Sequence, residues 1–323
     1  MLKILFMRRF KKTPDGVMRT SGTHIKLRDY FLYCLQHPQL EPYLYFTPDS
    51  DFDASEVWAG IPREKIVREI DLNNYGGLFL TGRDWKFLPK TLHDKKIINR
   101  LASIEQCQPD HLVFRYLKRP AFRICASREI HQAILPYVSD ETLVINNGIP
   151  LELFNGNGEK KSRSIMIWAR KQPAFGAKLF EAIKNRGRQA ALLVHNLPRE
   201  QFAQRLKESD IAITLPEKTE GFYMPALEAM ASGCAVICPD AIGNRAFCIH
   251  EQTCLMPRFG DLDDHLLMVE RLLAEQALQE NLRRQGMTMA ESYSMEKERQ
   301  NFYRFLDKFI LTKDRLAACP TIK

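Results

Sequence analysis

The sequence predicts an α/β protein with two Rossmann-like domains that face each other across a cleft. Short apolar runs alternate with longer helical stretches along the chain, which is typical of parallel sheets covered by helices. A polar stretch with two glycines, residues 152–163, separates two such series. The 323 residues are long for one domain and sufficient for two. Ligands of such folds bind at the carboxyl ends of the strands.

The strand and helix candidates set the domain boundaries. Strands are expected at 2–7, 42–47, 77–81, 96–99, 122–126 and 142–145, and again at 164–169, 190–194, 211–214, 235–238 and 253–256. Helices are expected at 24–36, 127–136, 174–185, 199–207, 225–232 and 261–286. We therefore place the first domain at 1–155 and the second at 156–293. Residues 294–312 form a separate amphipathic helix, because their apolar residues recur at near-helical spacing.

Composition and charge narrow the classes of protein. The chain is 45% hydrophobic and 27% charged, an ordinary globular mixture, and its net charge is +8. That charge favours an anionic partner: a sugar nucleotide, an acidic membrane surface or nucleic acid. No apolar run reaches the 18 residues that a membrane helix needs. The basic residues Arg8 and Arg9 follow the short apolar N-terminus, the reverse of a secretory signal. We expect a cytoplasmic protein, with peripheral membrane contact as an alternative role of the terminal helix.

The eight cysteines do not indicate a metal site. Several lie in apolar, strand-like runs, where a free cysteine acts as a small buried hydrophobe. The pairs Cys234/Cys238 and Cys248/Cys254 lack the two-residue spacing of zinc knuckles and an accompanying histidine pair. An Asp-x-Asp triplet at 49–51 lies in a polar loop without the surroundings of a metal-dependent transferase. We therefore expect no metal and no cofactor.

The most informative stretch is 219–237, which reads as a loop, a short helix and a strand. Pro225 suits the first helical turn, and Gly233 suits the left-handed position that ends a helix. The loop follows the strand at 211–214, so its backbone N–H groups and the helix dipole form a diphosphate site. Glu220 in the loop and Glu228 in the helix can accept hydrogen bonds from sugar hydroxyls. The alternative, stabilisation of the helix N-terminus by charge, accounts for at least one of them.

These residues resemble a known enzyme family. Glu220 and Glu228 reproduce the E-x7-E pattern of retaining GT-B glycosyltransferases, specifically the large family often called family 4. The letters EGFYMPALEAMASGCAVI are similar to that family's E-G-F-G-L-P-x-L-E-A-M-A-x-G-x-P-V-V. Residues 144–149 resemble its V-I-x-N-G-V segment, and residues 165–171 resemble the strand before its basic phosphate-binding pair. The resemblance covers roughly residues 110–310. The first hundred residues share with the family only the alternation of strands and helices.

The resemblance implies an activity. A member of this family transfers a sugar from a nucleoside-diphosphate sugar to a glycan, a lipid-linked acceptor or another hydroxyl, as in polysaccharide biosynthesis. It does so with retention of anomeric configuration and without a divalent metal. The first domain would lie on the acceptor side and the second would bind the nucleotide sugar. The helix at 294–312 would cross back to the first domain.

It also implies roles for residues of the second domain. Glu228 would hold the ribose hydroxyls, and Glu220 would contact the donor sugar. Arg170 and Lys171 would neutralise the diphosphate as it leaves, with Lys178 as an alternative second cation. For each lysine the competing interpretation is a solvated charge at the start of a helix. Preorganised cations of this kind lower the barrier because the leaving group gains negative charge in the transition state.

The donor loop departs from the family at one position. The amides of Gly221, Phe222, Tyr223 and Met224 would add donors to the diphosphate. Tyr223 stands where the family has a second glycine, so the loop is expected to be stiffer or differently shaped. The basic pair departs as well, because the family often separates its arginine and lysine by several residues.

The candidate site residues in the first domain are supported by weaker motifs than those in the second. Family members often carry a histidine in the cleft near residues 103–107, where this sequence has none. His24, which follows the first strand, is the nearest substitute and our candidate catalytic histidine; its alternative is a surface residue at a helix start. Asp84 is a candidate ligand of a substrate hydroxyl, and its alternative is a helix cap.

Two other functions remain as alternatives. A nucleic-acid-directed glycosyltransferase or a nucleic-acid-binding protein would use the positive charge, but no zinc-finger, RRM-like or helix-turn-helix signature accompanies it. A catalytically inactive GT-B scaffold would keep the fold alone. The presence of Glu220, Glu228 and Arg170 argues against the scaffold.

Overall fold

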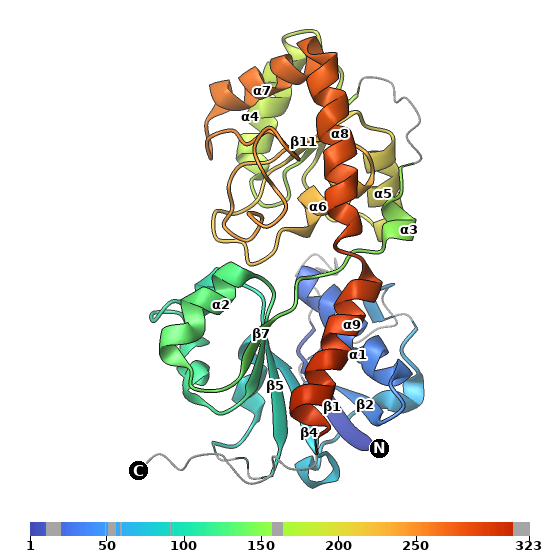
Figure 1. Ribbon diagram of the computed structural model, residues 1–323, viewed down its shortest axis with the longest axis vertical. Helices are drawn as coiled ribbons and strands as arrows, with labels where there is room; N and C mark the ends of the chain where they lie inside the picture. The colour runs from blue at the N-terminus through green and yellow to red at the C-terminus, as the bar shows by residue number, and fades with distance from the viewer. Residues whose placement is uncertain are drawn as a thin grey trace. The chain divides into compact units, whose positions relative to one another are not determined.

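The computed structural model describes residues 1–10, 21–48, 50, 56–58, 60–90, 92, 94–156 and 164–312. The chain divides into two compact units (Figure 1). The first unit is Met1–Ile145 with Arg299–Lys323, and the second is Asn146–Glu298. Each unit is built on a parallel sheet with helices packed against it, which confirms the predicted α/β class.

The described part of the first unit contains a seven-stranded parallel sheet in the order β3-β2-β1-β4-β5-β6-β7. The strands are β1 (Leu2–Arg8), β2 (Leu40–Phe46), β3 (Ile66–Val67), β4 (Gly77–Thr81), β5 (Lys96–Leu101), β6 (Phe122–Cys125) and β7 (Thr142–Val144). Ile4 to Met7 are fully buried, as expected of an apolar run in a central parallel strand. The strand order reverses between β1 and β4, which makes that pair the topological switch point of the sheet.

Helices and short turns cover this sheet. The helices are α1 (Gly22–Gln36), α2 (Arg128–Ile134) and α9 (Met295–Phe305), which a π-helical turn, Leu306–Ile310, continues. The 3-10 turns are η1 (Glu56–Trp58), η2 (Arg63–Lys65), η3 (Leu72–Asn74), η4 (Gly82–Phe87), η5 (Ile104–Cys107), η6 (Phe114–Lys118) and η7 (Leu135–Tyr137). Both α1 and α9 place aromatic rings on the strands: Phe31 contacts Phe6 at 5.4 Å, and Phe302 contacts Phe79 at 6.3 Å between ring centroids.

The aromatic face of the predicted terminal helix is packed inside the first unit. Phe302 meets Tyr30 of α1 edge to face, with 4.7 Å between ring centroids. Phe309 stacks on Phe122 of β6, and Phe302, Phe305 and Phe309 are at most 2% exposed. The apolar face that would enter a membrane surface is therefore already covered. No helix in the described ranges is long and apolar enough to cross a membrane.

The second unit has a four-stranded parallel sheet, among the residues described, in the order β11-β10-β8-β9. Its strands are β8 (Ile165–Trp168), β9 (Ala190–Leu193), β10 (Ile211–Thr214) and β11 (Ala235–Ile237). Its helices are α3 (Leu151–Phe154), α4 (Pro173–Lys184), α5 (Arg199–Lys207), α6 (Met224–Ala231), α7 (Leu262–Ala274) and α8 (Gln276–Glu291). Helix α4 packs against β8, β9 and α7, while α6 packs against β10, β11 and α8.

Two expected elements differ from the structure. Residues 253–256 do not form a strand, because Leu255 makes only an isolated bridge to Ile237. The single helix expected at 261–286 is two helices that meet at Glu275. The Asp-x-Asp triplet at 49–51 falls on Asp49 and Asp51, which lie outside the described residues.

The division between the units falls at Ile145/Asn146, before the 155/156 boundary expected from the polar linker. The reason is packing. Ile149 N–H donates to the Tyr293 carbonyl at 2.8 Å, and Gly148 lies so close to Ser294 that a Cβ would come within 2.5 Å of its carbonyl oxygen. Gly156 lies even closer to the Ser232 carbonyl oxygen. Because glycine has no Cβ, it permits both close approaches, and residues 146–156 therefore pack against the second unit.

Candidate active site

The loop that precedes α6 is built as the sequence predicts. Strand β10 ends at Thr214, the loop follows, and α6 begins at Met224 with Pro225 in its first turn. Gly233 takes a φ of 70°, the left-handed conformation that ends a helix. The N-terminus of α6 therefore lies beyond the carboxyl end of a central strand, where backbone N–H groups can bind an anion.

Glu220 is paired with a predicted catalytic cation. Its Oε1 accepts a hydrogen bond from Lys171 Nζ at 2.5 Å and another from the Glu217 backbone N–H at 3.1 Å. The side chain is 11% exposed. Burial raises the pKa of Glu220 above its usual value, and the Lys171 charge opposes that rise. The structure thus brings together Glu220 and Lys171, which are distant in sequence.

Glu228 is paired with a residue that the sequence analysis missed. Its carboxylate is 2% exposed, and Arg199 Nη1 donates to its Oε1 at 2.6 Å. Arg199 begins α5 and lies over the Phe154 ring, with 4.9 Å between its Cζ and the ring centroid. Its place after the predicted strand at 190–194 is the signal that could have drawn attention to it, because ligand-binding residues gather there.

The other predicted cations differ in position. Arg170 is half-buried just beyond β8, and its charge acts on the hydroxyl of Tyr223. Burial raises the pKa of that hydroxyl well above its usual value, and Arg170 opposes the rise. Lys178 lies on the exposed side of α4. The contacts seen among the described residues join Lys171, not Lys178, to the donor loop.

The side chains between Gly221 and Met224 are packed inward. Phe222 lies against Phe247 and Tyr293, with centroid distances of 5.1 and 5.8 Å. Tyr223 and Met224 are 2% and 8% exposed. These residues therefore hold the loop in shape, and what they can offer a ligand is their backbone N–H groups. The aromatic Tyr223 takes the place of a flexible glycine by filling the core beneath the loop.

A second turn holds the Glu220 loop in place. Gly243 N–H donates to the Glu220 carbonyl at 3.1 Å. Asn244 fixes this turn, since its Nδ2 donates to the Pro239 carbonyl at 2.9 Å and its Oδ1 accepts from the Ala241 N–H at 3.0 Å. A Cβ at Gly243 would overlap backbone atoms of Glu220 and Gly221.

We therefore expect Gly243→Ala to displace the donor loop. The overlap involves backbone atoms, which cannot rotate away as a side chain can, so the protein should lose about 1–3 kcal/mol of unfolding free energy. The measurement is urea unfolding of the variant beside wild type. An unchanged midpoint would mean that the two turns are not packed as described.

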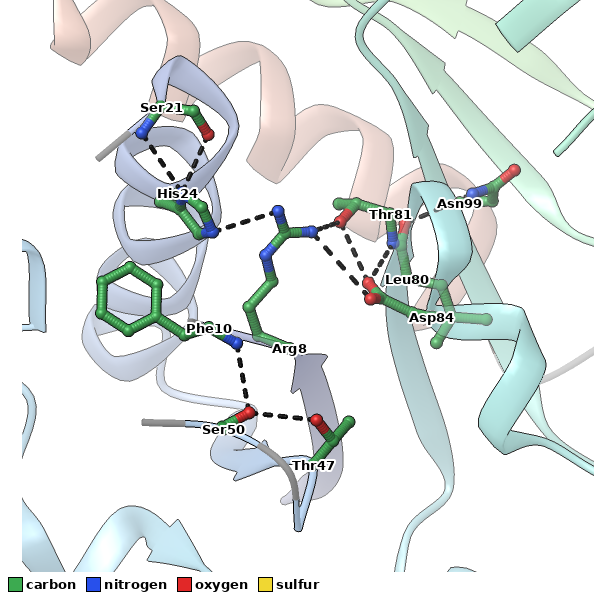
Figure 2. A network of polar contacts seen from close by, with 10 residues as sticks. All are labelled: Arg8, Phe10, Ser21, His24, Thr47, Ser50, Leu80, Thr81, Asp84 and Asn99. Carbon is green, nitrogen blue, oxygen red and sulfur yellow. Dashed lines mark hydrogen bonds and ion pairs between the residues drawn. The ribbon is translucent and has the colours of Figure 1, made fainter. Parts of the chain in front are cut away.

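In the first unit, polar side chains meet at the carboxyl ends of β1 and β4 (Figure 2). Arg8, the last residue of β1, donates from Nη1 to Thr81 Oγ1 at 3.0 Å, and its Nη2 lies 3.2 Å from His24 Nε2. Asp84 accepts from the Thr81 N–H at 2.7 Å and from the Thr81 hydroxyl at 3.0 Å. Asp84 therefore caps the η4 turn, which is the alternative that the sequence left open for it.

Both ring nitrogens of His24 have polar neighbours. Nε2 faces Arg8 Nη2, which can only donate. Nδ1 accepts from the Ser21 backbone N–H at 3.2 Å and lies 2.8 Å from Ser21 Oγ. Burial of the ring, together with the Arg8 charge, lowers the pKa of His24 to about 3. His24 is therefore neutral at pH 7, and both ring nitrogens are occupied by this network.

The ionisation of His24 and Asp84 predicts an unusual pH dependence of stability. Between pH 6.5 and about 3 the unfolded chain protonates His24 and the folded chain does not, so acid destabilises the fold. Burial raises the pKa of Asp84 from 3.8 to about 6, so here the folded chain binds the extra proton and acid stabilises. The two contributions oppose each other between about pH 4 and 6.

His24→Gln should reveal this opposition. Relative to wild type, the variant should gain up to about 1.4 kcal/mol of unfolding free energy per pH unit as the pH falls from about 6 to 4. Urea unfolding at several pH values measures it. His195→Gln, which changes an exposed histidine, is the control and should follow wild type. Parallel curves for His24→Gln and wild type would contradict the assignment.

Comparison with known proteins identifies the fold. Residues 175–289 match the model of the family described as glycosyl transferases group 1. Sucrose-phosphate synthase (tll1590) from Thermosynechococcus elongatus superposes with a TM-score of 0.69 at 14% identity, covering 95% of this chain and 99% of that one. Alr3699/HepE from Anabaena, solved with UDP and glucose, gives 0.69 at 14% identity, with 95% and 100% covered. The chain has the GT-B fold.

A third structure supports the same fold. A glycosyltransferase from Rickettsia africae ESF-5 superposes with a TM-score of 0.66 at 10% identity, covering 96% of this chain and 99% of that one. A search of the curated proteins finds no match. The residues that match the glycosyl transferases group 1 model all lie in the second unit, and they include Glu220 and Glu228.

Proposed function

We propose that this GT-B chain is a glycosyltransferase that transfers a sugar from a nucleoside-diphosphate sugar to a hydroxyl acceptor with retention of configuration. The observation that carries the proposal is the pair of buried carboxylates on one strand–loop–helix element, each held by a cation from a neighbouring segment. Glu228 binds the ribose hydroxyls, and Glu220 binds the donor sugar. The N–H groups that open α6 bind the diphosphate.

The charges explain how the bond to the leaving group is broken. As the anomeric carbon separates from the diphosphate, negative charge accumulates on the phosphate oxygens. Arg170 and Lys171 stabilise that charge, and fixed donors of this kind supply much of an enzyme's rate acceleration. Lys171 exchanges its contact with Glu220 for one with the diphosphate, which releases the Glu220 carboxylate to accept hydrogen bonds from the sugar.

A uridine nucleotide is the first donor to test. The HepE structures contain UDP with glucose and UDP-glucose, and a pneumococcal O-GlcNAc transferase structure contains UDP and GlcNAc. These ligands belong to those proteins, and they support a UDP-sugar here by similarity of fold. The acceptor we propose is a carbohydrate or lipid-linked hydroxyl.

The proposal is tested by release of nucleoside diphosphate from UDP-, GDP- and ADP-sugars in the presence of simple glycosides. Wild type should turn over one class of donor, and Glu220→Ala should lose at least about hundredfold of that rate. Glu200→Ala, an exposed glutamate of α5, is the matched control and should retain it. If no donor is hydrolysed or transferred and none binds, the chain is a GT-B scaffold without this chemistry.

Retention is tested on the product of the active donor. NMR of the newly formed glycosidic bond should show the same anomeric configuration as the donor. An inverted product would overturn the assignment to a retaining family while leaving the donor site intact.

A further inference from the structure

The topological switch point of the first sheet carries an arginine. Strand order reverses between β1 and β4, and open α/β sheets bind ligands outside the carboxyl ends of the strands at such a reversal. Arg8 is the last residue of β1, and Thr81 is the last residue of β4. The cationic side chain of Arg8 therefore lies at the point of the sheet where such folds bind ligands.

The guanidinium of Arg8 is held in place by neutral acceptors. Thr81 Oγ1 takes one N–H and His24 Nε2 takes another, as Figure 2 shows. The Thr81 hydroxyl hydrogen is directed to Asp84, and His24 Nδ1 faces the backbone N–H and Oγ of Ser21. These two contacts hold the guanidinium and engage two of its five donors.

The charge of Arg8 is only loosely compensated. Among the described residues, the closest carboxylate oxygen is Asp84 Oδ1, which lies 4.0 Å from Nη1, beyond hydrogen-bonding distance. The other oxygen of Asp84 is engaged by both Thr81 donors. Arg8 Nε is buried and has no hydrogen-bond partner among the described residues, while 17% of the side chain is exposed. The planar fork of an arginine suits bidentate binding of phosphate or carboxylate.

We propose that Arg8 anchors an anion site in the first unit, which binds the phosphate or carboxylate group of a ligand. His24 and Thr81 are positioning residues that hold the guanidinium for that ligand. Resting on the proposed function, this ligand is the acceptor, which is then an anionic one: a phosphorylated sugar or lipid headgroup, or a sugar acid.

The site can be tested without any nucleotide. The probes are glycerol phosphate for the phosphate class and glucuronate for the carboxylate class, titrated calorimetrically into the full chain at low ionic strength. Wild type should bind at least one of them, and Arg8→Gln should weaken that binding at least about tenfold. Arg83→Gln removes the same charge from an exposed position in the adjacent η4 turn, so it should bind as wild type does.

Two further variants separate this site from others. Arg8→Lys keeps the charge but loses the fork, so it should show an intermediate loss and also serves if Arg8→Gln does not fold. Lys171→Ala should leave probe binding unchanged, because Lys171 belongs to the second unit. No binding by wild type, equal binding by Arg8→Gln, or a loss in Lys171→Ala instead would each overturn the proposal. UDP titrated in parallel reports separately on the donor site.

Discussion

Replacing Glu228 with alanine is expected to weaken binding of the nucleoside diphosphate about hundredfold or more. The carboxylate would accept two hydrogen bonds from the ribose, and hydrogen bonds to a charged group contribute about 1.5–3 kcal/mol each. The side chain is 2% exposed, so alanine removes an acceptor that lies away from bulk solvent. Calorimetric titration of UDP, GDP and ADP into wild type and variant measures the loss.

Two residues of α5 make the Glu228→Ala result specific to the nucleotide site. Arg199 is 26% exposed at its side chain, so it can turn toward solvent when its partner is removed, and the fold should survive. Glu200→Ala lies next to Arg199 in sequence, on the exposed side of α5, and should bind the nucleotide as wild type does. Equal affinity in Glu228→Ala and wild type would remove Glu228 from the nucleotide site.

Lys171→Ala is expected to lower kcat about 10²–10³-fold, the usual cost of removing one preorganised donor from a developing negative charge. KM for the donor should change less, because the lysine acts most strongly when the diphosphate leaves. In the free enzyme the variant also removes the charge that opposes the raised pKa of Glu220, so the acid limb of its pH profile of kcat/KM should move to higher pH.

Two lysines of the neighbouring helix α4 serve as comparisons for the Lys171→Ala variant. Lys184→Ala changes an exposed lysine at the end of α4 and should retain wild-type kcat. Lys178→Ala addresses the alternative second cation that the sequence left open. A loss in Lys178→Ala with full activity in Lys171→Ala would reverse our assignment and place the cation on α4.

The donor loop could be predicted from sequence because its determinants are local. Pro225 begins α6, Gly233 ends it, and apolar strands precede and follow, so three neighbouring elements follow from a few letters. The partners of the two glutamates are not local. Lys171 and Arg199 reach them only after β8, β9 and β10 have paired, and no spacing in the sequence encodes that contact.

In the first unit, too, the contacts between residues distant in sequence could not be predicted. The sequence indicated His24 and Asp84 separately, as residues of two loops, and treated Arg8 only as part of a basic run after the first strand. The strand order places β1 beside β4, which brings Arg8 against Thr81, 73 residues away in sequence. Among the elements, β3 has two residues, which is too short for a period, and the break at Glu275 has no glycine or proline to announce it.

The most direct test of the donor site is a crystal structure of this chain with the nucleoside diphosphate of its active donor. We expect the ribose hydroxyls on Glu228 and the diphosphate at the N-terminus of α6, with Lys171 turned from Glu220 toward the phosphates. A nucleotide bound elsewhere on the second unit, with the Lys171–Glu220 and Arg199–Glu228 pairs undisturbed, would contradict the proposed donor site.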